Sequence, residues 1–448
     1  MIEQMKPSGI DWIGDVPFSW KMLKLKYFSY LKGRIGWQGL TADEFIDEGP
    51  YLITGTDFEN GRIQFDRSYH ISEERYEQAP EIQLKIGDLL VTKDGTVGKM
   101  AYVDELPDKA SLNSHLLLIR PLKNRYDNRF LFWLMSSTVF TGYTDYSQDG
   151  TIMASLSQEK IGNFIAYFPT VEEQVKIADY LDAKCSKFDS IIADLEKQIH
   201  TLQKYKKSLI TETVTKGLDK SAPMKDSGIE WIGKIPEHWS VKRLKFMLES
   251  GSESMKVGPF GSALSGSDII DEGKWVYNQR TVLDDNFTEN TAFISEEKFK
   301  EMRGFAVNAG DILITTRGTI GKVAIVPDPC EEGILHPCII KFRVNDSLIL
   351  PELLKIIFNE SDFVKDQFTL MSNATTIEVI YSYSLKDVIL PVIPTEEQKS
   401  IYFYLKEKCE TIDDVLKTKK SELEHIQQHK KSLIYEYVTG KKRVTEVK

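Results

Sequence analysis

The sequence predicts an α+β fold in which two globular domains are separated by two long helices that form an antiparallel coiled coil, with an internal pseudo-twofold repeat. Three observations support this prediction: motifs that recur in order, a heptad pattern at the end of each copy, and short alternating runs with turn residues at the start of each copy. The 448 residues exceed one ordinary core, so two or more domains are expected.

The internal repeat appears in motifs that return in the same order. A lead-in motif, WIG-x-x-P-x-x-W, spans residues 12–20 and returns at 231–239. The stretch GDLLVTKDGTVGKMAYV begins at Gly87 and returns as GDILITTRGTIGKVAIV from Gly310, with ten of seventeen positions identical. Unrelated sequences would match at about one of these positions. The two halves, hereafter copy one and copy two, therefore share a common origin.

The first part of each copy is rich in glycine, aromatic and β-branched residues. In copy one, alternating runs at 88–91 and 100–103 bracket the turn residues Asp94 and Gly95. This pattern is typical of strands joined by a tight turn. It predicts a mainly β or α+β domain.

The last part of each copy predicts a long helix. PTVEEQ in copy one and PTEEQ in copy two place Thr170 or Thr395 as a possible N-cap before paired acidic residues, which suits a helix start. Each helix continues through KKSLI to Gly217 or Gly440. About 45 residues at roughly 1.5 Å each give a rod near 65 Å long.

The predicted helices carry apolar residues at seven-residue spacing, a coiled-coil signal. Each helix could pack on its own domain, but two equivalent seams in one chain can satisfy each other, and an antiparallel pair is the simplest twofold arrangement. The seam residues are Leu181, Phe188, Leu195, Leu202 and Leu209 in copy one, and Leu405, Ile412, Ile426 and Leu433 in copy two. The expected divisions are 1–168 (first globular domain), 169–218 (central helix), 219–393 (second globular domain) and 394–440 (distal helix).

The charge distribution restricts the possible partners. The net charge is −10, and the segments 1–168, 169–224, 225–394 and 395–448 carry −5, 0, −7 and +2. No segment is a basic block, so any nucleic acid must bind where positive potential is locally focused. No apolar run approaches the roughly 20 residues that span a bilayer, and no secretory signal begins the chain. We expect a cytoplasmic protein.

The sequence lacks the motifs of common enzymes. The Gly-Lys pairs at Lys99 and Lys322 lack the upstream glycine and the following Ser or Thr of a P-loop, and neither HExxH nor GxSxG occurs. The Asn/Asp-Pro-Pro-aromatic signature of amino-methyltransferases is also absent. Seven histidines lack ligand spacing, and none of the four cysteines forms a CxxC pair, so reduced structural thiols and no metal site are expected.

The ordered double occurrence of the lead-in, of GDxLxTxxGTxGK and of a PTxEEQ-initiated helix ending in KKSLI resembles the specificity subunit of type I restriction-modification systems, over almost the whole chain. The resemblance implies two target-recognition domains that each read one half of a split site in double-stranded DNA. It also implies paired helices that set the spacing and bind two modification subunits. Catalysis would lie in the modification and restriction subunits, with S-adenosylmethionine, ATP and Mg²⁺ there and no cofactor in this chain.

The turn in GDxLxTxxGTxGK supplies the first candidates for DNA contact. Its glycines are interpreted as turn positions that need positive φ. Residues shared by the copies suit phosphate contacts, and residues that differ suit base reading, with arginine able to bond guanine bidentately. The shared lysines could equally be solvated. The candidates are Lys93, Thr96 and Lys99 in copy one and Arg317, Thr319 and Lys322 in copy two.

Further candidates lie in polar loops, and each of them could equally be ordinary surface. The lead-in tryptophans are expected to pack in the core or between domain and helix rather than to stack on bases. The loop candidates are Arg34, Trp37 and Gln38 in GRIGWQGL, Ser262 in GPFGSAL, Gln279 and Arg280 after a predicted strand, Gln148 and Thr151 in YSQDGT, and Asn373, Thr375 and Thr376 in MSNATT.

The leading hypothesis is a non-catalytic DNA-binding subunit that reads a bipartite, asymmetric site and scaffolds modification and restriction subunits. An alternative, favoured by the acidic net charge, is a coiled-coil scaffold whose globular domains bind only protein. A self-sufficient nuclease or methyltransferase conflicts with the missing motifs.

Overall fold

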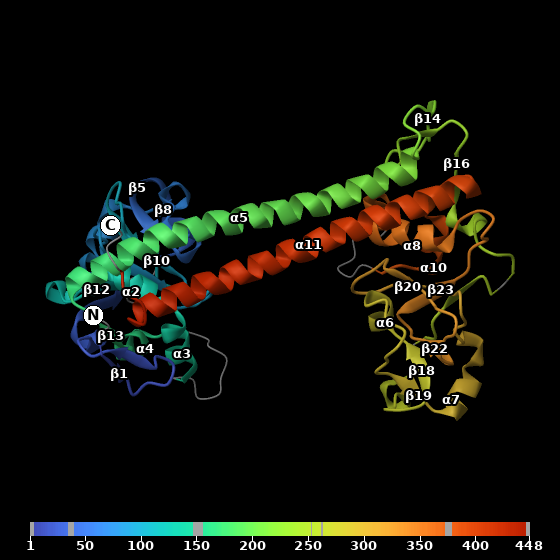
Figure 1. Ribbon diagram of the computed structural model, residues 1–448. Coiled ribbons are helices and arrows are strands. Elements are labelled where there is room, and N and C mark those ends of the chain that lie inside the picture. Colours follow the sequence, from blue (N-terminus) through green and yellow to red (C-terminus); the bar gives the residue numbers. More distant parts are fainter. Residues whose placement is uncertain are drawn as a thin grey trace. The chain divides into compact units, whose positions relative to one another are not determined.

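The computed structural model describes residues 4–34, 40–146, 156–251, 253–260, 263–371 and 379–444. The chain folds as two compact units: unit 1 is Met1–Glu196 with Ser421–Lys448, and unit 2 is Lys197–Lys420. Each unit contains one globular domain and parts of the two long helices, α5 (Val171–Lys216) and α11 (Thr395–Val438) (Figure 1). No helix in the described part of the chain has the length and apolar character needed to cross a membrane.

The globular domain of unit 1 is built on a four-stranded antiparallel sheet, β10-β9-β12-β4, and a three-stranded sheet, β11-β5-β8, in which β11 runs parallel to β5. Ribbons β1-β2, β6-β7 and β13-β3 complete it. The strands are β1 Met5–Pro7, β2 Asp15–Pro17, β3 Lys21–Lys24, β4 Ser29–Gly33, β5 Ile46–Ile53, β6 Phe58–Glu59, β7 Arg62–Ile63, β8 Tyr69–His70, β9 Leu89–Thr92, β10 Met100–Tyr102, β11 Ala110–Leu112, β12 Leu116–Pro121 and β13 Ile165–Phe168, and the helices are α1 Glu73–Glu77, α2 Asn128–Met135, α3 Thr138–Tyr146 and α4 Gln158–Asn163.

The four-stranded sheet separates two apolar cores in unit 1. Side chains alternate along a strand, so Leu89 and Val91 of β9 join the core shared with α2, α5 and α11, whereas Leu90 joins the core beneath the three-stranded sheet. All three side chains are fully buried. Because both faces are covered, the sheet rigidly positions the turn between β9 and β10.

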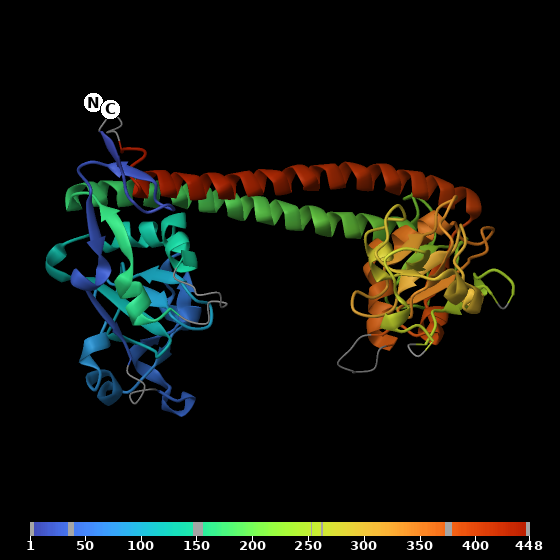
Figure 2. The same ribbon diagram turned by 90° about the horizontal axis from the view of Figure 1, so that it is seen from below.

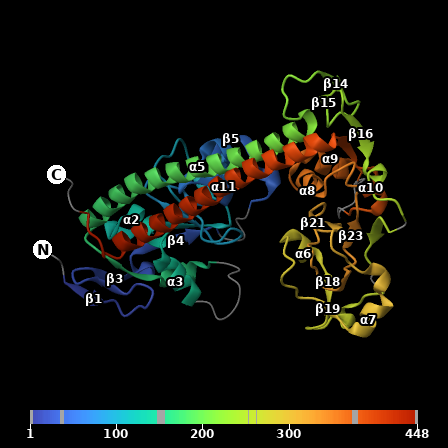
Figure 3. The ribbon, with the colours of Figure 1, turned by 45° about the vertical axis from the view of Figure 1, so that its right-hand side comes forward.

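The globular domain of unit 2 repeats this plan with sheets β17-β23-β20-β21 and β19-β18-β22 and ribbons β14-β15 and β16-β24. Figure 3 shows α8 and α9 beside the long helices, and β18 and β19 on the far side of this domain. The strands are β14 Met224–Asp226, β15 Lys234–Pro236, β16 Ser240–Arg243, β17 Met255–Val257, β18 Lys274–Tyr277, β19 Phe293–Ile294, β20 Ile312–Thr315, β21 Val323–Ile325, β22 Gly333–Leu335, β23 Ile339–Phe342 and β24 Ile389–Val392, and the helices are α6 Gln279–Leu283, α7 Glu296–Glu301, α8 Pro351–Glu360, α9 Asp362–Met371 and α10 Ser382–Asp387.

The long helices pack against each other in opposite directions within each unit. In unit 1 the Tyr180 and Tyr437 ring centroids are 4.5 Å apart and those of Phe188 and His429 are 5.2 Å apart, so numbering rises along α5 as it falls along α11 (Figure 2). In unit 2, Nζ of Lys206 lies 2.8 Å from Oδ1 of Asp413, in a matching register. The α+β class and the antiparallel helix pair predicted from the sequence are confirmed.

The PTxEEQ motif joins each globular domain to its helix. The side chain of Gln174, 1% exposed, accepts a hydrogen bond from the backbone N–H of Asp127 at 2.8 Å, and Gln398, equally buried, accepts one from Leu350 at 2.7 Å. Thr170 caps α5 as predicted, because its Oγ1 accepts from the N–H of Glu173 at 3.3 Å. The corresponding prediction for Thr395 is wrong, since Thr395 is the first residue of α11 and its hydroxyl bonds to a carbonyl oxygen instead.

The lead-in motif packs against a helix end in both units. Trp20 lies against Gly440 after α11, and Trp239 lies against Gly217 after α5, and both indoles are 1% exposed. The two glycines have φ of 72° and 76°, the left-handed conformation that commonly ends a helix. The tryptophans therefore have the packing role predicted from the sequence.

Candidate nucleic-acid interface

The Gly-Thr turns, residues 93–99 and 316–322, are equivalent hairpin loops, and the same pattern of hydrogen bonds closes both of them. The hydroxyl of Thr315 donates to the carbonyl oxygen of Thr319 at 2.7 Å and accepts from the N–H of Lys322 at 3.0 Å. The Thr92 hydroxyl makes the same two contacts in copy one, to Thr96 and Lys99. All four glycines of the turns have φ between 65° and 84°, which explains why both copies keep glycine there.

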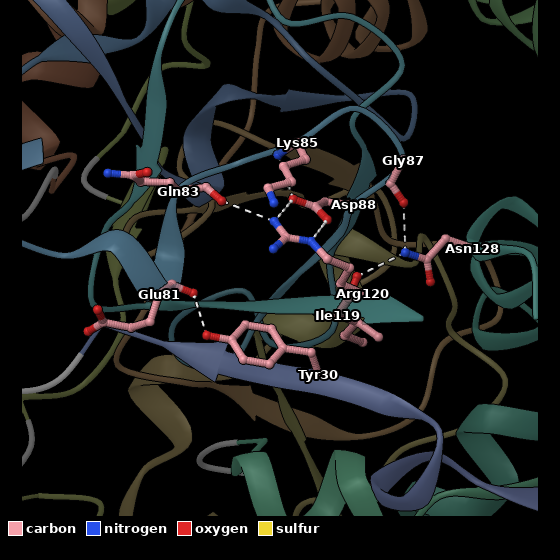
Figure 4. Close-up of polar contacts among 9 residues, drawn as sticks. All are labelled: Tyr30, Glu81, Gln83, Lys85, Gly87, Asp88, Ile119, Arg120 and Asn128. Carbon is pink, nitrogen blue, oxygen red and sulfur yellow. Dashed lines mark hydrogen bonds and ion pairs between the residues drawn. The ribbon is translucent and has the colours of Figure 1, made fainter. Parts of the chain in front are cut away.

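A buried ion pair beneath each turn explains the aspartate of the GD motif. Asp88, 1% exposed, accepts from Nε of Arg120 at 2.6 Å, which ties the start of β9 to β12 (Figure 4). In copy two, Asp311 pairs with Nε of Arg343 at 2.6 Å and Nζ of Lys341 at 3.0 Å. Breaking a buried pair leaves an uncompensated charge and typically costs about 3–5 kcal/mol. The aspartates therefore hold the hairpins in place.

The candidate side chains of the two turns differ in availability. Thr96, Lys99, Arg317 and Thr319 are exposed and Lys93 is half-buried. The Arg317 guanidinium has no hydrogen-bond or ion-pair partner among the described residues, which leaves it available to a ligand.

The lysines shared by the two turns have different surroundings. Nζ of Lys99 is at the surface and donates to the carbonyl oxygen of Gly55 at 3.3 Å. Nζ of Lys322 donates to the carbonyl oxygen of Asn359 at 3.1 Å, and burial lowers the pKa of this lysine. Lys322 therefore has a structural contact at the end of α8 that Lys99 lacks.

Gln279 and Arg280 lie beside the turn of copy two. They begin α6 directly after β18, and Nε2 of Gln279 donates to the carbonyl oxygen of Arg317 at 2.7 Å. Arg280 is 76% exposed, with Nε 3.3 Å from Oδ2 of Asp284. The structure thus brings Gln279 and Arg317, which are 38 residues apart, into contact.

Arg34 lies inside the first globular domain. It is 4% exposed, its Nε donates to the carbonyl oxygen of Leu112 at 2.7 Å, and its guanidinium also bonds to Oγ of Ser111 at 3.0 Å. Burial is the main reason that the pKa of Arg34 falls to about 10. These contacts occupy the side chain, and we leave Arg34 out of the proposed DNA-contacting set.

Eight candidates lie outside the described residues. The described segments that follow the candidates of YSQDGT and MSNATT are bonded to the Gly-Thr turns. The N–H of Leu156 donates to the carbonyl oxygen of Lys93 at 2.8 Å, and that of Ile380 donates to the carbonyl oxygen of Thr316 at 2.9 Å. The eight candidates are Trp37, Gln38, Gln148, Thr151, Ser262, Asn373, Thr375 and Thr376.

The structure adds a loop that the sequence reasoning missed. His115 lies beside the turn of copy one, because its carbonyl oxygen accepts from the N–H of Lys93 at 2.9 Å and its Nδ1 is 3.5 Å from Oδ2 of Asp94. Cys338 is its counterpart and accepts from the N–H of Thr316 at 3.0 Å. The sequence contains one signal that could have found this loop. Asn-Ser-His, which ends at His115, and His-Pro-Cys, which ends at Cys338, are separated by the same number of residues as the two Gly-Thr turns.

Each unit also has a cleft between its globular domain and the long helices. The cleft of unit 1 has a volume of about 1200 Å³ and contains an ion pair between Asp189 and Lys430. The cleft of unit 2, about 1060 Å³, contains the equivalent pair of Asp413 and Lys206. Among the described residues no cluster of His, Cys, Asp or Glu could hold a metal ion.

A module that occurs twice, each time with the same hairpin turn and different side chains on it, defines a protein built from two related but non-identical domains. The family model for the type I restriction modification DNA specificity domain matches residues 22–202 and 236–425, and the chain belongs to this family. The resemblance stated from the motifs is confirmed.

Relatives cover almost the full length of the chain. A protein of Methanocaldococcus jannaschii, named provisionally as the type I restriction enzyme MjaX specificity subunit, is 27% identical over 96% of each chain. The MjaVIII specificity subunit of the same organism is 25% identical over 96% of this chain and 94% of its own. The chain is accordingly a specificity subunit and not itself an enzyme.

A solved structure has the same fold. This structure is described as "Structural basis underlying complex assembly and conformational transition of the type I R-M system". The two chains superpose with a TM-score of 0.66 at 17% identity, over 94% of this chain and 98% of the other.

Proposed function

We propose that the chain reads a bipartite, asymmetric site in double-stranded DNA, each globular domain contacting one half. Within this proposal, Lys93 and Lys99 contact the first half, and Arg317, Thr319 and Gln279 contact the second. Arg317 suits guanine, because a guanidinium can bond O6 and N7 together.

The observation that carries the proposal is the contrast within the two Gly-Thr turns. Their closing hydrogen bonds are the same, but an exposed Arg317 stands in copy two where copy one has Asp94, which lies near His115. Two domains that read different half-sites need the same backbone conformation in the turn but different exposed side chains on it.

We further propose that the paired helices bind two modification subunits, one at each cleft, and that restriction subunits join this complex. The clefts support this because they occupy equivalent places in the repeat and carry the same Lys-Asp pair. S-adenosylmethionine, ATP and Mg²⁺ would be bound by those partners, and the complex would act in the cytoplasm.

The test exchanges one base-reading candidate in the complex with its modification partner. Arg317→Asp installs the copy-one residue and should change the preferred bases of the second half-site only, measured by selection from duplexes randomised in both halves. Arg303→Asp makes the same charge change at another exposed position of unit 2 and should leave both halves unchanged.

Two results would contradict the proposal. A perfectly palindromic preferred site would oppose unequal half-sites. Absence of salt-dependent DNA binding by the assembled complex would favour the protein-only scaffold, to which the net charge of −10 also points.

A further inference from the structure

The segment that leads into helix α10 is hydrogen-bonded to the Gly-Thr turn of copy two, and two exposed tyrosines lie at the start of this helix. Ile380 is hydrogen-bonded to Thr316, and the next residue, Tyr381, is the N-cap of α10. Tyr381 is 53% exposed and Tyr383 65% exposed, and their rings stack with centroids 5.4 Å apart and planes 7° apart. This pair therefore lies at the surface, directly after a segment that is bonded to the turn that carries Arg317.

Basic residues adjoin this tyrosine pair. The turn after β16, Leu244–Phe246, is bonded to the end of α10, because the N–H of Leu244 donates to the carbonyl oxygen of Val388 at 2.8 Å. Arg243 and Lys245 lie 3.1 and 3.3 Å from Oδ1 of Asp387 in α10. Residues of these two elements form the basic–aromatic patch: Arg243, Lys245, Phe246, Tyr381, Tyr383 and Lys386.

The composition of the patch indicates an anionic partner. Phe246 is 62% exposed, with Nζ of Lys245 5.3 Å from its ring centroid, so three large aromatic side chains are exposed on two adjacent elements. Grouped exposed aromatics mark binding surfaces more often than isolated ones do. The patch contains three cations, and only two of them, Arg243 and Lys245, pair with the carboxylate of Asp387, which leaves positive charge in an acidic chain.

Copy one has only part of this patch. There Nζ of Lys26 lies 5.2 Å from the ring centroid of Tyr27, itself 67% exposed, which matches Lys245 and Phe246. The helix α4, however, has Ser157 and Glu159 at the positions of Tyr381 and Tyr383. The stacked tyrosines thus distinguish the second domain from the first.

We propose that the basic–aromatic patch binds the sugar-phosphate backbone of duplex DNA beside the second half-site, without reading bases. Tyrosine hydroxyls and cationic side chains donate to phosphate oxygens, and such contacts position a protein on DNA. This inference rests on the proposed function, because it extends the surface around Arg317.

The test uses the complete complex with its modification partner and a duplex that contains the selected site. Tyr381→Ser with Tyr383→Gln gives uncharged counterparts of the copy-one residues, and Ser is itself a good helix cap, so folding should be retained. Specific affinity should fall roughly tenfold or more, as expected for lost hydrogen bonds to charged groups. The selected bases should stay the same. Phe18→Ser, at a 65% exposed aromatic of unit 1 outside the long helices, is the matched control and should change nothing.

A second variant tests the charges. Lys245→Ala with Lys386→Ala should lower the dependence of log affinity on log salt by about 0.9 per lost phosphate contact. Lys300→Ala, at an exposed lysine of α7 in the same unit, is the control and should leave the slope unchanged.

The outcomes separate this inference from the proposed function. If the wild-type complex fails to bind specific DNA, the proposed function fails. If it binds and the patch variants match it in affinity and salt slope, only the patch assignment is overturned. Loss of modification subunits from the variant on gel filtration, with DNA binding lost in step, would instead make the patch a protein-docking surface.

Discussion

The side chain of Gln279 donates a hydrogen bond from Nε2 to the carbonyl oxygen of Arg317 at 2.7 Å, and this contact ties the start of α6 to the Gly-Thr turn of copy two. Copy one has Gly55 at the equivalent position, where the backbone carbonyl accepts from Nζ of Lys99 at 3.3 Å. The two turns are therefore held against the same neighbouring segment by different groups.

Gln279→Ala should weaken the choice of bases at the second half-site. Stability should change by no more than about 1 kcal/mol, because the lost bond is exposed and water can replace it. The turn that presents Arg317 loses a fixed contact, so selection from a randomised library should return a less defined second half. An equal loss of definition in both halves would show that Gln279 has no local positioning role.

Arg317→Ala and Lys322→Ala should have opposite effects, although the two residues belong to one turn. The guanidinium of Arg317 has no partner among the described residues, so removal of this side chain should cost about 1–3 kcal/mol of base discrimination and leave thermal unfolding unchanged. Lys322 donates to Asn359, so its removal should lower stability by about 1 kcal/mol and change DNA affinity less. Fluorescence anisotropy with labelled duplex and thermal unfolding measure the two effects. The reverse pattern would make Lys322 the DNA contact.

The repeat and its heptads predicted the architecture because both are regular signals in the chain. An antiparallel pair was expected from two equivalent seams, and Tyr180 beside Tyr437 within unit 1 bears this out. The N-cap of α11 was wrongly assigned to Thr395, which is the first residue of the helix, because one Thr can serve as cap or as first helical residue according to contacts distant in sequence, here with Ser347.

The candidate site was less predictable because burial depends on tertiary contacts. Arg34 stands in a polar, glycine-rich stretch typical of an exposed loop, yet it is bonded to the edge of β11. Lys99 and Lys322 are identical in the repeat, but only the copy-two lysine reaches a carbonyl oxygen at the end of a helix. Single-residue roles of this kind follow from neighbours that no local pattern specifies.

Acid should destabilise unit 2 through His336. Burial lowers the pKa of His336, so the unfolded chain takes up a proton more readily than the folded one. Stability from this group is present above the unfolded value, about 6.5, and is lost as pH falls through the lower folded pKa. Hydrogen-exchange protection of β18 and β22 should therefore decrease between about pH 7 and pH 5, by on the order of 1 kcal/mol or less.

His336→Asn is the matched control for this acid effect. Copy one has Asn113 at the position, where Oδ1 accepts from the N–H of His115 at 3.0 Å, as Nδ1 of His336 accepts from Cys338 at 3.1 Å. The variant should keep the turn and lose that part of the acid sensitivity. The same pH dependence in both proteins would assign the effect to other groups.

The equivalent cysteines, Cys185 and Cys409, should remain free thiols after oxidation. Cys185 belongs to the apolar core of unit 1 that includes Leu433 and Ile434, whereas Cys409 and Leu209 both pack against the core of unit 2. Residues 185 and 209 are about 36 Å apart along α5, and a disulfide needs Cα atoms within about 7 Å.

Burial supports the same expectation for the thiols, since it raises the pKa of Cys185 to about 12 and also raises that of Cys409. Peptide mapping after oxidation should find no link between them. Phe188→Cys with His429→Cys, whose rings are in contact, should crosslink as a positive control. A link between Cys185 and Cys409 would rule out the antiparallel register.

The proposed spacing role of the helices can be tested by lengthening both. One heptad inserted after Glu196 in α5 and one after Lys420 in α11, at the boundary of the two units, keep the apolar seam in register and add about 10 Å to each helix. A base pair occupies about 3.4 Å along the duplex, so the preferred spacer should grow by up to about three base pairs. The bases read in each half should stay the same, because both Gly-Thr turns are untouched. Selection from duplexes randomised in half-sites and spacer length would measure both quantities, with insertion of a heptad in α5 alone as the mismatched control. An unchanged spacer in a folded, DNA-binding complex would mean that another part of the assembly sets the distance.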